Sequence, residues 1–186
     1  RFCDRTFWLK NGEVVEAGDT MDVTTNYENF LKKKSIKTVD REKTIKNEET
    51  VPDIIEVEKA TLLNYALEPL EMVNQDEKVI LKLEYTVKND TIKSPVCGVA
   101  IRTVDNNYVC GLNTLLDQVE IPWKKGKNVF YLEYGKMSLL TGEYYFDIAF
   151  FEEHATVPLV YKTKYLNMFI TGRYAGEGIV ILDHEW

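Results

Sequence analysis

The sequence lacks most of the features that mark membrane, secreted and nucleic-acid-binding chains. Its 186 residues include three cysteines and two histidines, and no apolar run approaches the ~20 residues that a transmembrane helix needs. The first residues do not have the basic, apolar and small-residue regions of a signal peptide. The net charge is −7, whereas a protein that binds nucleic acid needs a basic face. We therefore expect a cytoplasmic chain, or a fragment of a longer one, without a nucleic-acid partner.

The few cysteines exclude a disulfide framework and a zinc centre. Cys3, Cys97 and Cys110 are odd in number and form no C-x-x-C pair. Cys97 and Cys110 flank a predicted hairpin with its turn at residues 105–107, and that register sets Cys110 closer to Ile101 than to Cys97. We interpret them as reduced, partly buried thiols. No metal and no other cofactor is expected.

A hairpin followed by a helix is predicted at the start of the chain. Residues 6–10 and 13–17 alternate like strands, and Asn11-Gly12 between them is the strongest short signal of a β-hairpin. Gly18-Asp19 is expected to end the pairing, with Asp19 capping a helix over residues 19–34. A lone hairpin and helix are marginal in water, so we expect residues 1–31 to belong to a larger fold.

The rest of the chain divides into a linker and a series of strands. Residues 32–53 lack aromatic side chains and mix both charges densely, which predicts a charged linker. From Ile54 onward, turn residues separate nine strand-like segments: 54–64, 78–89, 96–104, 108–114, 117–121, 127–135, 143–151, 165–171 and 178–186. No convincing helix lies among them. Residues 54–186 are therefore predicted to be an all-β domain, a β-sandwich.

Alternation within three of these strands separates a core face from a solvent face. The predicted core positions are Leu81, Leu83, Tyr85, Val87, Phe130, Leu132, Tyr134, Tyr144, Phe146, Ile148 and Phe150. The opposite faces are only half polar, because they set aromatic rings beside carboxylates. Aromatic rings beside carboxylates on a solvent-exposed face require an explanation.

The opening segment resembles the end of an ABC-transporter ATPase domain. The matching positions are Cys3-Asp4-Arg5, Trp8-Leu9, Gly12, Gly18 and the stretch from Val23 to Tyr27. The phosphate loop, the signature loop and the switch histidine of such an ATPase have no counterpart in this sequence. We therefore expect residues 1–31 to be the remnant of a truncated ATPase domain, and we expect the chain neither to bind nor to hydrolyse ATP.

Residues 54–186 resemble the C-terminal domain of Wzt-type subunits, the ATPases of bacterial O-antigen polysaccharide exporters. The matching segments are PVCGVAI (95–101), VCGLNT (109–114), VFYL (129–132), LLTGEYYF (139–146) and GIVILDHEW (178–186). The resemblance implies an immunoglobulin-like β-sandwich that binds the exported polysaccharide without cleaving it. It also implies a homodimer, for which exchange of residues 178–186 is one route. Through the parent ATPase it implies contact with the exporter's transmembrane subunit, at the inner face of the cytoplasmic membrane.

The aromatic and carboxylate residues of the solvent faces predict where a glycan would bind. Sugars stack on aromatic rings and bond through their hydroxyls to charged and amide groups, and neighbouring strands bring such side chains within ~5 Å of each other. The predicted carbohydrate-binding residues are Arg102, Tyr131, Glu133, Tyr145 and Asp147.

Other interpretations of the same residues stay open. Aromatic side chains are ordinary on strand surfaces, and the sandwich could serve only to dimerise the ATPase or to dock a protein. Glu133 and Asp147 form a carboxylate pair of the kind that glycosidases use. Trp123 is either a loop anchor or a sugar-stacking ring.

Overall fold

The computed structural model of the chain describes residues 5–20, 22–24, 26–27, 30 and 54–185. The chain divides into two compact units, Arg1–Ile45 and Lys46–Trp186, and each is described by itself. The predicted linker at residues 32–53 and the residue Cys3 lie outside the described residues.

The first unit contains the predicted hairpin. β1 (Arg5–Lys10) and β2 (Glu13–Asp19) pair in antiparallel fashion. Asn11 and Gly12 have φ angles of 53° and 86°, as the type I′ turn favoured by Asn-Gly requires. The pairing extends further than predicted, because Arg5 lies opposite Asp19 and the ladder does not stop at Gly18.

Helical residues follow the hairpin. Positions 20, 22–24, 26–27 and 30 are helical, within the range predicted. The ring of Trp8 lies 5.5 Å from that of Tyr27 and 5.0 Å from that of Phe30, so one face of the hairpin packs on the helix. Phe7 and Leu9 are more than half exposed.

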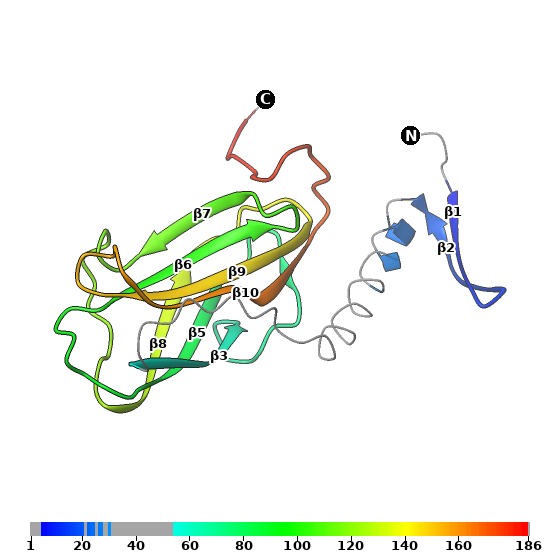
Figure 1. Cartoon of the computed structure of the whole chain (residues 1–186). Coiled ribbons are helices and arrows are strands. Elements are labelled where there is room, and N and C mark those ends of the chain that lie inside the picture. The colour runs from blue at the N-terminus through cyan, green and yellow to red at the C-terminus, as the bar shows by residue number, and fades with distance from the viewer. Residues whose placement is uncertain (1–4, 21, 25, 28–29, 31–53, 186) are drawn as a thin grey trace. The chain divides into compact units, whose positions relative to one another are not determined.

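The second unit is a β-sandwich of two sheets, which confirms the predicted fold class (Figure 1). The five-stranded sheet has the order β4 (Val73–Asn74), β10 (Pro158–Thr171), β9 (Gly142–Phe151), β6 (Val96–Thr103), β7 (Tyr108–Asn113). The three-stranded sheet has the order β3 (Ile55–Leu63), β5 (Val79–Val87), β8 (Gly126–Tyr134). All pairs are antiparallel except the short parallel pair of β4 and β10.

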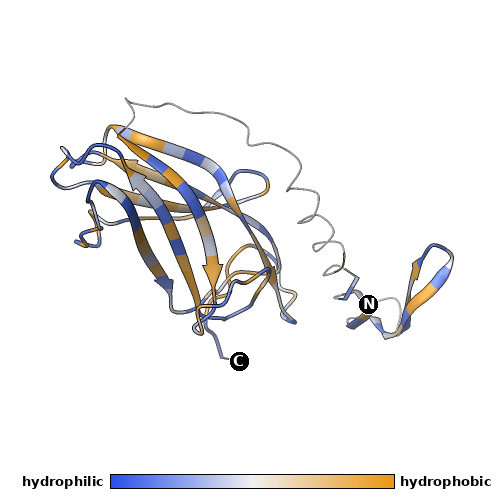
Figure 2. Cartoon of the chain, turned by 90° about the horizontal axis from the view of Figure 1, so that it is seen from below, coloured by the Kyte–Doolittle hydropathy of each residue, from blue (hydrophilic) through white to orange (hydrophobic). Residues whose placement is uncertain are grey.

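One hydrophobic core lies between the two sheets. Of the eleven predicted core positions, eight are buried, and Phe130, Leu132 and Tyr134 are partly buried against the same cluster. Figure 2 shows hydrophobic and hydrophilic bands alternating along the strands. The period-two pattern therefore identified the inward faces of β5, β8 and β9 correctly.

Two predicted strands are not strands. Residues 117–121 follow a turn in which the N–H of Asp117 bonds to the carbonyl of Asn113 and Gln118 takes a left-handed φ of 56°. In the segment 178–185, Val180 forms one isolated bridge with Leu139. Around this bridge, the N–H of Leu140 bonds to the carbonyl of Ile179 and the N–H of Ile181 bonds to the carbonyl of Ser138.

Two strands differ from their predicted extent. β10 begins at Pro158 instead of residue 165, because a register irregularity between Lys162 and Leu166 interrupts the alternation on which the prediction relied. β4 has two residues and was not predicted.

Candidate functional site

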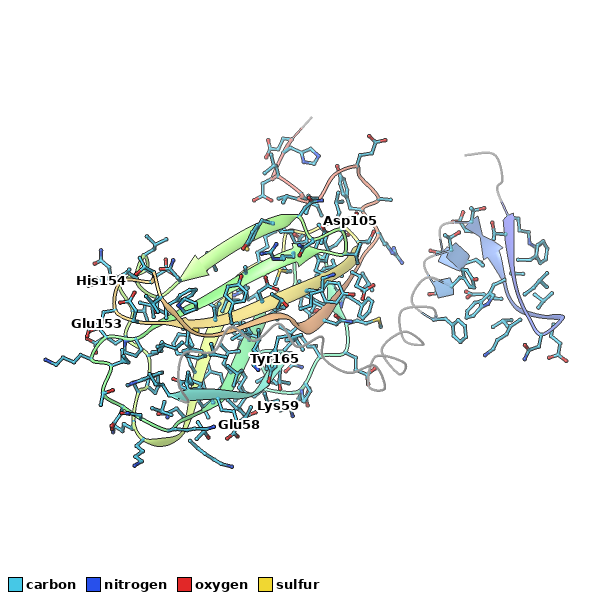
Figure 3. All side chains as sticks on the ribbon, in the orientation of Figure 1. Glu58, Lys59, Asp105, Glu153, His154 and Tyr165 are labelled. Carbon is cyan, nitrogen blue, oxygen red and sulfur yellow. The ribbon has the colours of Figure 1, made fainter. Side chains whose placement is uncertain are left out.

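Four strands of the five-stranded sheet bring a group of tyrosines and charged side chains together on its outer face. In register, Arg102 of β6 lies opposite both Tyr108 of β7 and Tyr145 of β9, and Tyr145 lies opposite Asn167 of β10. Asp105, labelled in Figure 3, marks the turn between β6 and β7 beside this row. We call the following residues the tyrosine cluster: Arg102, Tyr108, Glu143, Tyr145, Asp147, Tyr161, Lys164 and Asn167.

Asp147 is the buried centre of the cluster. Its side chain faces away from the core, yet the residue is only 1% exposed. Oδ2 accepts the Nε–H of Arg102 at 2.6 Å and the hydroxyl of Tyr161 at 3.4 Å, and Oδ1 accepts the backbone N–H of Lys164 at 2.8 Å. A carboxylate removed from water needs such donors to remain charged. The sequence predicted a solvated carboxylate here, and this was wrong because neighbouring side chains cover it.

The irregularity in β10 shapes one side of the cluster. Lys162 lies opposite Ile148 and Leu166 opposite Phe146, so three residues of β10 stand across from Asp147 alone. The middle one, Lys164, has a left-handed φ of 49°. Its Nζ lies 5.0 Å from the ring centroid of Tyr145, a cation–π arrangement. Bulges of this kind redirect side chains next to functional sites.

The guanidinium of Arg102 is held on three sides. Besides its bond to Asp147, it donates from one terminal nitrogen to the carbonyl and the side-chain oxygen of Asn106 at 3.2 and 3.3 Å. Its carbon lies 3.6 Å from the ring centroid of Tyr108. The Arg102 side chain is consequently only 14% exposed, whereas Tyr108 is 61% exposed. The arginine therefore fixes the position of an aromatic ring that faces solvent.

Tyr145 is fixed by its hydroxyl group. It donates to Oε1 of Glu143 at 2.8 Å, and Asn167 donates to the same oxygen at 3.3 Å. Burial, and then the hydrogen bond to Glu143, raise the pKa of Tyr145 to about 12. Burial likewise raises the pKa of Tyr161 to about 12. Both phenols therefore stay protonated and act as hydrogen-bond donors at neutral pH.

The predicted site residues thus fall into two groups. Arg102, Tyr145 and Asp147 belong to the tyrosine cluster. Tyr131 and Glu133 lie on β8 of the other sheet, opposite Lys82 and Ile80. They line a groove of about 160 Å³ between the edges of β7 and β8, whose inner wall is formed by apolar side chains. One binding surface cannot include all five residues.

This separation also bears on the glycosidase interpretation. Glu133 and Asp147 lie on different sheets, and Asp147 is buried under Arg102. A glycosidase needs two carboxyl groups that flank one bond at a short distance. The geometry of this pair does not provide that arrangement.

Five residues of the cluster were missed by the sequence reasoning: Tyr108, Glu143, Tyr161, Lys164 and Asn167. Tyr161 and Lys164 lie in a stretch where the bulge of β10 hides the strand pattern. Tyr108 and Asn167 lie on predicted strands, but only the observed register sets them beside Arg102 and Tyr145. The aromatic residues of VYKTKYLN (160–167) were the signal that could have pointed to Tyr161, Lys164 and Asn167.

Trp123 and the cysteines contribute to the interior. Trp123 is partly buried against the core, 6.3 Å from Phe150 between ring centroids, as expected of a loop anchor. Cys97 and Cys110 are free thiols, and Cys110 pairs with Ile101 as predicted. Burial raises the pKa of Cys97 to about 12, which keeps that thiol unreactive.

Neither a metal-binding cluster nor a membrane-spanning helix occurs in the described part of the chain. Residues 5–20, 22–24, 26–27, 30 and 54–185 contain no group of three histidine, cysteine, aspartate or glutamate side chains that could hold a metal ion. The helical residues among them form no helix long and apolar enough to cross a membrane.

Comparisons with known proteins identify the sandwich. The crystal structure of the C-terminal domain of Wzt aligns with a TM-score of 0.69 and 14% identity, over 77% of this chain and 89% of that one. A Niemann-Pick type C2 protein from the Japanese carpenter ant aligns with a TM-score of 0.46 and 10% identity, over 64% of this chain and 94% of that one. A search of curated proteins found no match.

The first of these structural alignments shows that the fold is shared with the Wzt domain. Residues 53–181, most of the chain, match the Wzt C-terminal domain family. The chain therefore belongs to the Wzt C-terminal domain family, a family of domains associated with ABC transporters.

Proposed function

We propose that the sandwich is a glycan-binding domain that recognises a bacterial surface polysaccharide of the O-antigen type and couples it to export by an ABC transporter. The observation that carries this proposal is the tyrosine cluster. It combines a solvent-exposed ring, Tyr108, with amide, phenol and carboxylate groups that are already held in place by Asp147 and Glu143.

The dimensions of the cluster suit a carbohydrate chain. Tyr108 and Tyr145 are separated by β6, hence by two strand spacings, or about 10 Å. Rings at that distance can support neighbouring sugars of one chain, while hydroxyl groups bond to the polar side chains between them. Because these side chains are fixed by their own hydrogen bonds, little conformational entropy is lost on binding.

The proposed partners follow from the family. The parent ATPase would bring the domain to the transmembrane subunit of an exporter, at the inner face of the cytoplasmic membrane. A homodimer is proposed as the working form, with exchange of residues 178–186 between two copies as the route to it.

A second candidate function is dimerisation or protein docking without contact to sugar. The apolar groove beside Tyr131 and Glu133 supports it, as do the exposed side chains of Val180 and Leu182 in the C-terminal segment. Tyr131 and Glu133 lie on β8 of the other sheet, so substitutions in the groove and in the tyrosine cluster can test the two functions separately.

The experiment is a calorimetric titration with the surface polysaccharide of the source bacterium. Tyr108→Ala is expected to weaken binding about five- to 150-fold, by analogy with the ~1–3 kcal/mol per stacked base. Tyr131→Ala is the matched control, because Tyr131 is similarly exposed, at 52%, but lies on the other sheet. Loss of affinity only in Tyr131→Ala would move the site to the groove. Absence of binding by the unaltered chain would favour the docking function.

A further inference from the structure

We propose that the stretch of polysaccharide bound at the tyrosine cluster is uncharged, composed of neutral sugars without uronic acid or phosphate groups. This inference rests on the proposed function and adds the class of ligand. It follows from the contacts that each charged side chain of the cluster already makes within the protein.

Arg102 is not available to an acidic ligand. Recognition of a carboxylate or a phosphate by arginine uses a fork of two N–H groups directed at the ligand. Here the Nε–H points to Asp147, one terminal nitrogen points to Asn106, and the flat face lies on Tyr108. With 14% of its side chain exposed, Arg102 has little surface left for a second anion.

The second cation, Lys164, is matched by a carboxylate on the same face. Its Nζ lies over the ring of Tyr145 and 3.5 Å from the carbonyl oxygen of Val104. The hydroxyl of that same tyrosine bonds to Glu143, which stands two residues away on the same side of β9. An acidic group drawn to Lys164 would therefore also approach the charge of Glu143. The two cations and two carboxylates of the cluster balance each other.

The groups that are left for a ligand are neutral. The exposed surface of the cluster offers the ring of Tyr108 and, around it, phenol and amide groups that both donate and accept hydrogen bonds. Sugar hydroxyls also donate and accept, so they match such groups, whereas a carboxylate can only accept. The surrounding domain gives no help to an anion either, since the chain has a net charge of −7 and repels polyanions at long range.

The test is binding of the full chain to immobilised bacterial polysaccharides of two matched sets. One set has repeats that contain uronic acid. The other consists of the same polymers after their carboxyl groups have been reduced to primary alcohols, together with naturally neutral polymers. Affinities are measured from about 0.05 to about 0.5 M NaCl, because screening over this range removes most of a surface charge interaction. The variant Glu143→Gln is measured in parallel, with its melting temperature as the control for folding.

We expect binding to neutral polymers that changes less than about twofold over this salt range, and we expect Glu143→Gln to weaken it about threefold through the loss of a charged acceptor. Binding confined to the acidic polymers, weakened by salt and strengthened by Glu143→Gln, would overturn the inference and leave glycan binding intact. Retention of the chain by neither set would overturn the proposed function itself.

Discussion

Arg102 and Asp147 form an ion pair, 2.6 Å between Nε and Oδ2, on the outer face of a sheet where both side chains are largely removed from solvent, at 14% and 2% exposure. A pair of this kind costs free energy to desolvate, and its loss is most damaging when one partner stays behind. We expect Asp147→Ala to lower the free energy of unfolding by about 3 kcal/mol. Asp147→Asn should cost less, because the amide oxygen can still accept the N–H of Lys164. Urea denaturation of the two variants checks this order.

The double variant Arg102→Met, Asp147→Leu separates stability from recognition. Apolar side chains of similar size remove both desolvation costs at once, so most of the stability lost in Asp147→Ala should return. Glycan affinity should not return, because Tyr108 loses the guanidinium on which its ring rests. A double variant that binds polysaccharide as the unaltered chain does would show that the ion pair has no part in recognition.

Substitutions of Tyr145 separate the contribution of its hydrogen-bonded hydroxyl from that of its ring. In Tyr145→Phe the ring remains, but the hydrogen bond to Glu143 is lost, and stability should fall by about 1 kcal/mol. In Tyr145→Ala the ring is lost as well, and polysaccharide binding should weaken by a further tenfold or so. Calorimetric titration beside thermal melting distinguishes the two. Equal affinities of both variants would place the bound sugar away from this ring.

Acid should loosen the loop after β9. The carboxylate of Glu152 accepts the backbone N–H groups of Thr156 and His154, both at 2.9 Å. These bonds lower its pKa from 4.5 to about 2. Since the pKa is lower in the folded state, the loop is stabilised fully above the pKa of the unfolded chain, and this is lost as the pH falls toward about 2.

The comparison that checks this is the melting temperature of the unaltered chain and of Glu152→Gln at pH values of about 6 and about 3. On acidification, the melting temperature of the unaltered chain should fall further than that of Glu152→Gln. Parallel losses would assign the acid sensitivity to other carboxylates.

Deletion of residues 178–186 probes the C-terminal segment. Two backbone bonds hold it to its own chain, from Leu140 to Ile179 and from Ile181 to Ser138, together with an ion pair of 2.6 Å between Lys136 and Asp183. Leu182 is 76% exposed, which leaves an apolar side chain for another surface to cover. If two copies exchange this segment, light scattering should show the deleted chain as a monomer or as aggregate. A well-folded dimer after deletion would place the interface elsewhere.

The alternation of apolar and polar residues predicted the sandwich well, because the strands of the sandwich bury every second side chain. Leu81, Leu83, Tyr85 and Val87 alternate with polar residues, and each is at most 1% exposed. The same rule applied to Tyr145 and Asp147 placed both correctly on the outer side of β9. It could not show that Asp147 is buried, since the covering side chains come from β6 and β10, which are distant in sequence.

The candidate site was predicted only in part, and the reason is related. Alternation shows which side of its own sheet a residue faces, but it does not show which strands share a sheet. Tyr131 and Tyr145 both faced outward as predicted, yet they belong to different sheets. The bulge at Lys164 could not be predicted from the sequence. Its left-handed backbone is held by the carboxylate of Asp147, without a glycine or asparagine at that position.

The three residues of β10 that stand opposite Asp147 give the sheet a place where its length and chemistry can vary. The ladder is in register on both sides of them, with Ile148 and Phe146 paired to Lys162 and Leu166. A residue gained beside Thr163 or Lys164, or a replacement of either, would change what lies over the ring of Tyr145. It would leave Tyr165 packed against the core, with its hydroxyl donating to the carbonyl of Val57. Homologues could therefore acquire new ligands by altering this short stretch, at little risk to folding.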